Sequence, residues 1–238
     1  MIVCLDSGNS RIKWGVHDGE RWLAQGAVDH AASGELAALT AAWPQPARVL
    51  LANVAGNAAA ARIREQLADW QSVFREVKAE AQRGGVTNRY QNPGQLGVDR
   101  WCALIGARSL TRAACVVVMA GTATTIDTLD AEGNFLGGLI LPGSALMRRA
   151  LARDTAGLPL AAGQYADYPR CTDDAIVSGA IEAQAGAIER AFRRLADSSA
   201  QCLVSGGDAP TLADYLVIPH VVAQNLPLEG LRTLAGDE

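Results

Sequence analysis

The chain has 238 residues, and its 21 lysines and arginines against 25 aspartates and glutamates give a formal net charge of -4. Hydrophobic residues make up 49% of it and charged residues 19%, a balance that excludes disorder as the dominant state. The acidic excess provides no broad attraction for nucleic acid or for an anionic membrane, and we expect neither as a partner. The net charge does not exclude a local basic pocket that binds a small ligand carrying phosphate.

The first residues, the cysteines and the histidines each argue against one class of protein or site. Residues 1–6 have no basic segment and reach a carboxylate at position 6, which is not the pattern of a signal peptide, so we expect a cytoplasmic protein. The five cysteines form no Cys-x-x-Cys pair, so neither a zinc site nor a redox pair is predicted. The histidines at positions 17, 30 and 220 match no catalytic triad or metal spacing.

In chain order, the apolar pattern of the first half predicts an α/β arrangement. The expected elements are strands at 2–5, 11–16 and 21–28, a helix at 35–43, a strand at 49–54, a helix at 58–70, a strand at 73–77, a loop at 83–97 and a helix at 97–110. Three hairpin strands followed by alternating helices and strands predict a mixed sheet.

After residue 112 the same pattern begins again. The expected elements are strands at 115–120, 126–129 and 135–141, helices at 145–152 and 173–196, strands at 201–205 and 215–222, and a helix at 228–234. When Gly8 is aligned with Gly121, the hairpin turns that follow fall at Gly19 and Gly133. This internal duplication predicts two similar α/β lobes, residues 1–112 and 113–238, with a ligand cleft between them.

Two turns are candidates for binding phosphate. The first, Asp6-Ser-Gly-Asn-Ser, offers backbone N–H groups, an amide and hydroxyls to phosphate oxygens, and Asp6 can hold Mg²⁺. Lys13 in the next strand can add a positive charge. The second turn, Gly121-Thr-Ala-Thr-Thr, has the same character, and neither is a Walker sequence. Taken alone, the first turn is better explained as a plain hairpin loop, since Asp, Gly and Asn all favour turns.

Two further segments carry candidate chemistry. Gly97 allows the loop to enter a helix whose first turn holds Asp99 and Arg100. A carboxylate there can take the proton of a substrate hydroxyl while the guanidinium binds an anionic group, although Asp is also favoured in a first turn as a cap. The turn Ser205-Gly-Gly-Asp is suited to a flat base lying against the backbone.

In their order along the chain, these motifs resemble type III pantothenate kinases. The resemblance is carried by Asp6-Ser-Gly-Asn-Ser, Gly97-Val-Asp-Arg, Gly121-Thr-Ala-Thr-Thr-Ile-Asp and Gly137-Gly-Leu-Ile-Leu-Pro-Gly, with weaker agreement at Thr172 and Gly206-Gly207. It implies two ribonuclease-H-like lobes of the acetate kinase, sugar kinase, Hsp70 and actin superfamily. It also implies ATP-dependent phosphorylation of pantothenate to 4′-phosphopantothenate, the first step of coenzyme A biosynthesis, by a homodimer.

The resemblance also implies a role for each matching position. The ATP phosphates would be bound by Asp6, Ser7, Gly8, Asn9, Ser10, Arg11, Ile12, Lys13 and Thr122, and Asp6 would hold Mg²⁺. The pantothenate pocket would consist of Tyr90, Gly97, Val98, Asp99, Arg100 and Thr172. Within it, Asp99 would be the general base on the primary hydroxyl, and Arg100 would meet the carboxylate. Phosphoryl transfer needs positioning and charge neutralisation more than covalent chemistry, so this set suffices.

One position departs from the family. Its members usually have Asp two residues before the glycine of the second turn, where it binds K⁺ or NH₄⁺, and this chain has Met119. A thioether is a poor ligand for a hard cation, so we expect an active kinase with weak or absent K⁺ activation.

Two other functions stay open. A non-catalytic regulatory or accessory protein on the same fold is one, although the joint presence of Asp6, Asp99 and Arg100 argues against it. A sugar or acetate kinase of the same superfamily is the other. The short chain, which has no large lid insertion, argues against that alternative.

Overall fold

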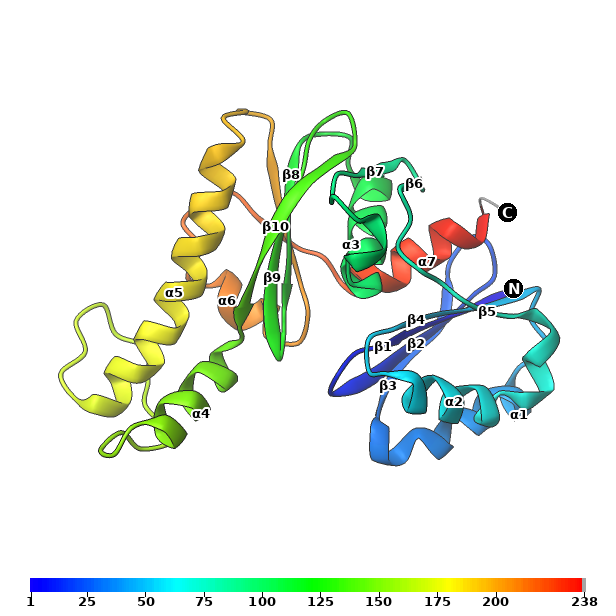
Figure 1. The fold of residues 1–238 in the computed structure, drawn as a ribbon, viewed down its shortest axis with the longest axis horizontal. Helices are drawn as coiled ribbons and strands as arrows, with labels where there is room; N and C mark the ends of the chain where they lie inside the picture. The colour runs from blue at the N-terminus through cyan, green and yellow to red at the C-terminus, as the bar shows by residue number, and fades with distance from the viewer. Residues whose placement is uncertain (237–238) are drawn as a thin grey trace. The chain divides into compact units, whose positions relative to one another are not determined.

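A computed structural model describes residues 1–236, and its internal contacts divide the chain into two compact units. Unit 1 comprises residues 1–112 together with the segment from Asn225 onward, and unit 2 comprises residues 113–224. Figure 1 shows the elements of each unit. The lobes expected from the sequence, 1–112 and 113–238, divide the chain at the same point, but they place its last helix in the second lobe. The division into two lobes with these bounds stays a prediction.

Unit 1 contains a mixed five-stranded sheet. Its elements are β1 (Ile2–Ser7), β2 (Arg11–His17), β3 (Trp22–Asp29), η1 (His30–Leu36), α1 (Ala37–Ala42), β4 (Arg48–Asn53), α2 (Asn57–Gln66), η2 (Ala68–Val73), β5 (Phe74–Glu76), β6 (Gln82–Arg83), β7 (Val86–Asn88), η3 (Pro93–Gln95), α3 (Val98–Leu110) and α7 (Leu226–Gly236). The strand order is β3-β2-β1-β4-β5. The pairs β3-β2 and β2-β1 are antiparallel, and the pairs β1-β4 and β4-β5 are parallel.

The alternation of β1 determines what each face of this sheet meets. Val3 and Leu5 point into a hydrophobic core formed with η1 and α2, in which Ile63 and Trp70 are also buried. Cys4 and Asp6 lie on the opposite face because successive strand residues alternate. That second face is covered by α7 and α3, which contact β1 and β4.

Helices α3 and α7 approach each other through glycines. A Cβ on Gly106 would overlap the carbonyl oxygen of Leu226, and one on Gly230 would overlap that of Cys102. Side chains also fasten α7 to the strands: Trp22 donates through Nε1 to Glu229 at 2.6 Å, and Arg48 donates to the carbonyl of Ala235. The last helix therefore packs in unit 1.

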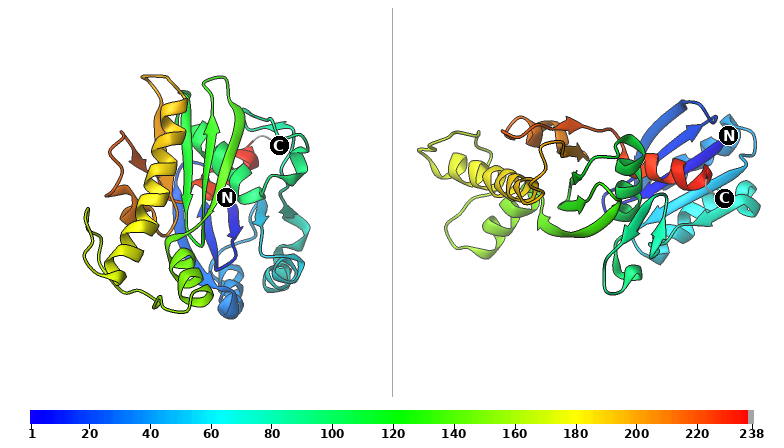
Figure 2. Two further views of the ribbon diagram at one scale, coloured as in Figure 1. Left: turned by 60° about the vertical axis from the view of Figure 1, so that its left-hand side comes forward. Right: turned by 90° about the horizontal axis from the view of Figure 1, so that it is seen from above.

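Unit 2 repeats the topology of unit 1. Its elements are β8 (Cys115–Ala120), β9 (Ala123–Leu129), β10 (Asn134–Pro142), α4 (Ser144–Asp154), α5 (Thr172–Arg194), β11 (Gln201–Ser205), α6 (Ala209–Ala213) and β12 (Val221–Val222). Within the unit the order is β12-β11-β8-β9-β10, with β8 to β10 antiparallel and β8, β11 and β12 parallel. Helix α5 packs on β8 and β9 (Figure 2). The repeated pattern expected from the sequence is thus present in the sheets.

Three sequence-based expectations were wrong in detail. The strand expected at 215–222 is reduced to Val221–Val222, because Pro219 lacks the N–H that a ladder needs. The expected loop at 83–97 contains the hairpin of β6 and β7, whose two-residue turn, Gly84-Gly85, has φ of 59° and 75°. The helix expected at 58–70 ends at Gln66 and is followed by the separate 3₁₀ turn η2.

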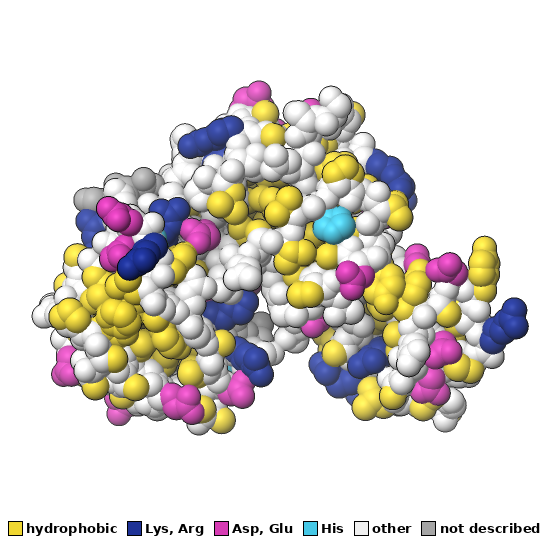
Figure 3. Space-filling model, turned by 180° about the vertical axis from the view of Figure 1, so that it is seen from behind, with side chains coloured by type: hydrophobic (Ala, Val, Ile, Leu, Met, Phe, Trp, Pro, Cys, Tyr) yellow, Lys and Arg dark blue, Asp and Glu magenta, His cyan; other side chains and the backbone are white. Residues whose placement is uncertain are grey.

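Two surface properties bear on the partners. Among residues 1–236, no helix is both long and apolar enough to cross a bilayer. On the face drawn in Figure 3, basic and acidic side chains are interspersed.

Candidate functional site

The turn between β1 and β2 places Asp6 and Lys13 side by side. These residues are partners in the antiparallel register, so their side chains lie on the same face. The turn is closed by the N–H of Gly8, which donates to the carbonyl of Arg11 at 3.1 Å. Asn9 and Ser10 are exposed at its tip, where backbone and side-chain donors can meet a ligand.

Two other members of the predicted phosphate set are engaged elsewhere. Ile12 is fully buried in the hydrophobic core, so it can offer a ligand only its backbone. The guanidinium of Arg11 pairs with Asp29 at 3.0 Å on the surface. The turn therefore depends on Asp6, Lys13 and the residues between Ser7 and Ser10 for ligand contacts.

Asp6 is a buried carboxyl group under electrostatic stress. Burial, followed by the nearby charge of Asp99, raises the pKa of Asp6 to about 7, and Lys13 lowers it. Among residues 1–236, neither Asp6 Oδ1 nor the buried hydroxyl of Ser7 has a hydrogen-bond partner. Because an unpartnered buried carboxylate is costly, Asp6 fits a cation such as Mg²⁺, which prefers carboxylate oxygens; the side chain of Ser7, the next residue of β1, points to the other face of the sheet.

Asp99 stands in the first turn of α3, where glycine makes room for it. A Cβ at Gly97 would lie 2.6 Å from Asp99 Oδ1, so a larger residue at 97 would displace the carboxylate. The same oxygen accepts the backbone N–H of Arg100 at 2.8 Å. Asp99 is half-buried, whereas its neighbour Val98 is buried. The carboxylate is thus fixed in orientation yet reachable.

Arg100, which is predicted to bind an anionic group, contacts Tyr90, another residue of the predicted pocket. Arg100 is buried and donates through Nη1 to Tyr90 Oη at 3.0 Å, and its guanidinium lies 5.7 Å from the centre of the Tyr90 ring. Asn88 holds this loop, accepting the N–H of Tyr90 and donating to the carbonyls of Glu80 and Pro93. Asn88 opens the segment Asn88-Arg89-Tyr90, in which the sequence indicated no specific role for it; its burial and its hydrogen bonds show that it organises the loop.

Thr122 and Thr172 lie in unit 2, whereas all the other predicted residues, Asp6, Lys13, Tyr90, Asp99 and Arg100 among them, lie in unit 1. Thr122 is exposed at the tip of the turn between β8 and β9. Thr172 is exposed at the first residue of α5, where it lines an open apolar groove of about 700 Å³ together with Met147 and Leu151. Each residue is accessible to a ligand.

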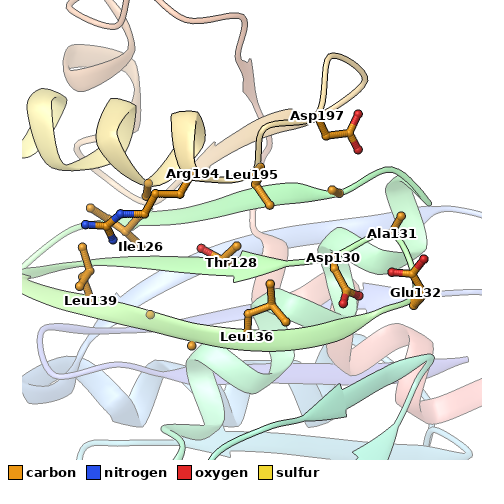
Figure 4. A pocket seen from close by; sticks show the side chains of 14 residues that line it. Ile126, Thr128, Asp130, Ala131, Glu132, Leu136, Leu139, Arg194, Leu195 and Asp197 are labelled. Atoms are coloured by element: carbon orange, nitrogen blue, oxygen red, sulfur yellow. The ribbon is translucent and has the colours of Figure 1, made fainter.

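Another cavity, also in unit 2, contains none of the predicted residues. It has a volume of about 540 Å³ and lies between β9, β10 and the end of α5, with Asp130, Glu132, Arg194 and Asp197 at its margin (Figure 4). Charges of both signs are mixed there with Leu136 and Leu139. It is separate from the candidate site.

Comparisons with known proteins identify the family to which these motifs belong. A family model for type III pantothenate kinases matches residues 2–194. The chain belongs to the type III pantothenate kinase family. It is 68% identical over 235 residues to the type III pantothenate kinase of Dechloromonas aromatica, covering 99% of both chains. It is 55% identical over 239 residues to that of Aromatoleum aromaticum, covering 100% of this chain and 99% of the relative.

Solved structures confirm the fold expected of the family. A protein named as a Baf family transcriptional activator from Campylobacter jejuni matches with a TM-score of 0.62 and 20% identity over 99% of this chain and 98% of that one. One named as a 2-dehydro-3-deoxygalactonokinase from Sinorhizobium meliloti matches with 0.58 and 16% over 99% and 97%. At these identities the likeness shows the fold alone.

Proposed function

We propose that this kinase transfers the terminal phosphoryl group of ATP to the primary hydroxyl of pantothenate, with Asp99 as the general base. Membership of the type III pantothenate kinase family makes the chain an enzyme of coenzyme A biosynthesis that phosphorylates pantothenate. The assignment of the base rests on one observation: the half-buried carboxylate of Asp99, held by Gly97 and the N–H of Arg100 beside Asp6.

The acceptor side of the reaction is assigned to α3 and the loop before it. Pantothenate carries a carboxylate and a primary hydroxyl, and Arg100 and Asp99 offer the matching anion receptor and proton acceptor. Adjacent positions in the first turn of α3 allow both ends of a small substrate to be held at once. Tyr90 supports the guanidinium of Arg100 through its hydroxyl and ring. With the substrate so oriented, Asp99 takes the hydroxyl proton as the oxygen attacks phosphorus.

The donor side is assigned to the two turns. Asp6 would hold Mg²⁺ directly or through water, and the bound ion neutralises the charge that develops on the phosphates. The turn at residues 7–10 and Lys13 supply donors and a positive charge to phosphate oxygens, and Thr122 does so from unit 2. Lys13 and a bound cation would also relieve the repulsion between Asp6 and Asp99.

The remaining parts of the proposal are drawn from the resemblance. We infer that the enzyme is a cytoplasmic homodimer, that Thr172 completes the pantothenate pocket, and that no nucleic acid or membrane takes part. The exposure of Thr172 beside an apolar groove supports its role. Met119 takes the position expected to bind K⁺, so activity is expected without that cation.

A coupled assay of ADP release tests the central assignment. Wild-type protein should release ADP only when pantothenate is present, and Asp99→Asn should lower kcat by about 10²–10⁴-fold because a general base is lost. Asp69→Asn, an exposed carboxylate in η2, serves as the matched control and should keep wild-type rates. Full activity of Asp99→Asn would refute the base, and absence of pantothenate-dependent ADP release would refute the function.

A further inference from the structure

Three chain segments meet at the turn that follows β8 in unit 2. The N–H of Gly143 donates to the carbonyl of Thr122 at 2.9 Å, and the N–H of Asp208 donates to that of Ala120 at 3.1 Å. A Cβ on Gly143 would overlap the carbonyl of Gly121, and one on Gly206 would overlap that of Ala120. The turns at 120–123, 142–144 and 205–208 are therefore packed backbone to backbone.

Arg148 is directed towards this junction by its place on α4. It follows Ser144, the first residue of the helix, by four positions, so the two share a face. Side chains of a helix lean towards its N-terminus, and α4 begins directly after Gly143. The long side chain of Arg148 thus reaches back along α4 towards the turn at 120–123.

One nitrogen of the Arg148 side chain has no protein partner in the described part of the chain. Its Nε is buried and has no hydrogen-bond partner among residues 1–236. The charge of Arg148 reaches Asp208, since burial raises the pKa of that carboxyl and Arg148 lowers it. Asp208 is itself anchored to Ala120 beside the turn. A guanidinium with a buried, unused donor beside a small-residue turn is a receptor for an anionic oxygen.

We propose that Arg148 binds a phosphate group of the nucleotide held at the turn of residues 121–125. This inference rests on the proposed function, in which Thr122 contacts the ATP phosphates. Arg148 supplies to the unit 2 side of the nucleotide a positive charge that the turn itself lacks. Asp208 keeps the guanidinium near the junction without forming a hydrogen bond that would compete with the ligand.

Direct titration of the full-length protein with ATP, ADP and adenosine, without pantothenate, tests the proposal. Arg148→Ala should weaken ATP and ADP binding by about 10–100-fold and leave adenosine binding unchanged, since charge-assisted hydrogen bonds to phosphate are lost. Arg148→Lys should recover part of the affinity. The matched control is Arg149→Ala, which removes the same charge from the next, exposed position of α4 and should bind as the wild type does.

Steady-state kinetics and thermal unfolding separate binding from structure. Arg148→Ala should raise KM for ATP, leave KM for pantothenate unchanged and unfold at the temperature of Arg149→Ala. Equal nucleotide affinities in Arg148→Ala and wild type would overturn the proposal. Equal losses of affinity for adenosine and for ATP would also overturn it. A third contrary result would be a lowered unfolding temperature in both Arg148→Ala and Arg148→Gln, with ATP affinity restored at low temperature. Each of these two results would show that Arg148 has a structural role.

The proposed function can fail separately from this inference. Thr122→Ala tests whether the turn contacts phosphate, and Asp99→Asn tests the general base. Asp99→Asn should bind ATP at least as tightly as the wild type does, because it removes a charge that opposes the ionisation of Asp6, whereas Arg148→Ala should bind ATP more weakly. Full activity in Asp99→Asn would refute the base while the titrations still decide the role of Arg148.

Discussion

The carboxylate of Asp99 occupies the space that a side chain at Gly97 would need, because a Cβ built there lies 2.6 Å from Asp99 Oδ1. The backbone at Gly97, with φ of -55° and ψ of 132°, is one that any residue adopts. The glycine is therefore needed for the position of the carboxylate and not for the course of the chain. This relationship allows the base to be displaced without unfolding the protein.

Gly97→Ala should lower kcat by about tenfold to a hundredfold, since a displacement near 1 Å can cost that much in a positioned reaction. The unfolding temperature should change little. Gly94→Ala is the control in the same loop, where an added Cβ would make only ordinary contact with Asn92 at 3.5 Å. Wild-type kcat in Gly97→Ala would show that the orientation of Asp99 does not limit the reaction.

The contact between α3 and α7 should be sensitive to a single methyl group. Gly230→Ala places a Cβ against the carbonyl of Cys102, which is backbone and cannot rotate away, and should destabilise the fold by about 1–3 kcal/mol or more. Gly186→Ala, at an exposed position of α5 with open space around it, should stabilise by about 0.5–1 kcal/mol. Urea unfolding of both variants compares the two. Equal effects would mean that the close approach is relieved at no cost.

His17 should make the fold less stable in mild acid. Burial, followed by the charge of Arg232, holds the pKa of His17 below its ordinary 6.5, against the opposite influence of Asp18 and Glu229. Its Nδ1 accepts the N–H of Gly19 at 3.0 Å, which requires that nitrogen to be unprotonated, and its ring meets the edge of Trp22.

The sign of this effect follows from proton binding. As the pH falls through 6.5 the unfolded chain takes up a proton at His17 before the folded protein does, so unfolding is favoured. Urea unfolding at about pH 7.5 and about pH 5.5 should show a smaller loss of stability in His17→Gln than in the wild type. An identical loss in both would assign the acid sensitivity to other groups.

Met119 should leave the enzyme with weak or absent activation by K⁺. It lies at the end of β8, in register with Thr125 on one side and Ser205 on the other. Replacing Na⁺ by K⁺ should leave the rate of the wild type unchanged, whereas Met119→Asp should gain activation because a hard carboxylate ligand is added beside two hydroxyls. Met119→Leu controls for the loss of the thioether. A clear rise of the wild-type rate in K⁺ would contradict the prediction.

The sequence predicted most of the fold because its signals are local. The hairpin turns at Gly19 and Gly133 and the apolar strands beside them are visible in order, and the two sheets repeat as expected. The turn at Gly84-Gly85 was missed although it has a local signal, because the glycines stand in a polar segment. The place of α7 could not be predicted, because Gly106 and Gly230 look like ordinary helix glycines until the two helices are seen in contact.

The candidate site was predictable residue by residue but not as a set. Asp6 lies beside a turn and Asp99 at the start of a helix, and each of these local patterns indicates that the carboxylate binds a ligand or a backbone N–H. Their electrostatic interaction depends on α3 covering the face of the sheet to which Asp6 points, which is a matter of tertiary packing. Ile12 shows another limit: the resemblance includes it among the phosphate-binding residues, and alternation along β2 buries its side chain in the core, so the predicted contact is restricted to its backbone.

The position of α7 has a consequence for the order in which the protein forms during synthesis. The face of the first sheet that carries Cys4 and Asp6 is covered by residues 226–236, which leave the ribosome after all of unit 2. Residues 1–112 therefore emerge with that face of the sheet uncovered, and more than a hundred further residues are synthesised before α7 can pack on it. The second unit, continuous in the chain, has every segment it needs before the first unit does.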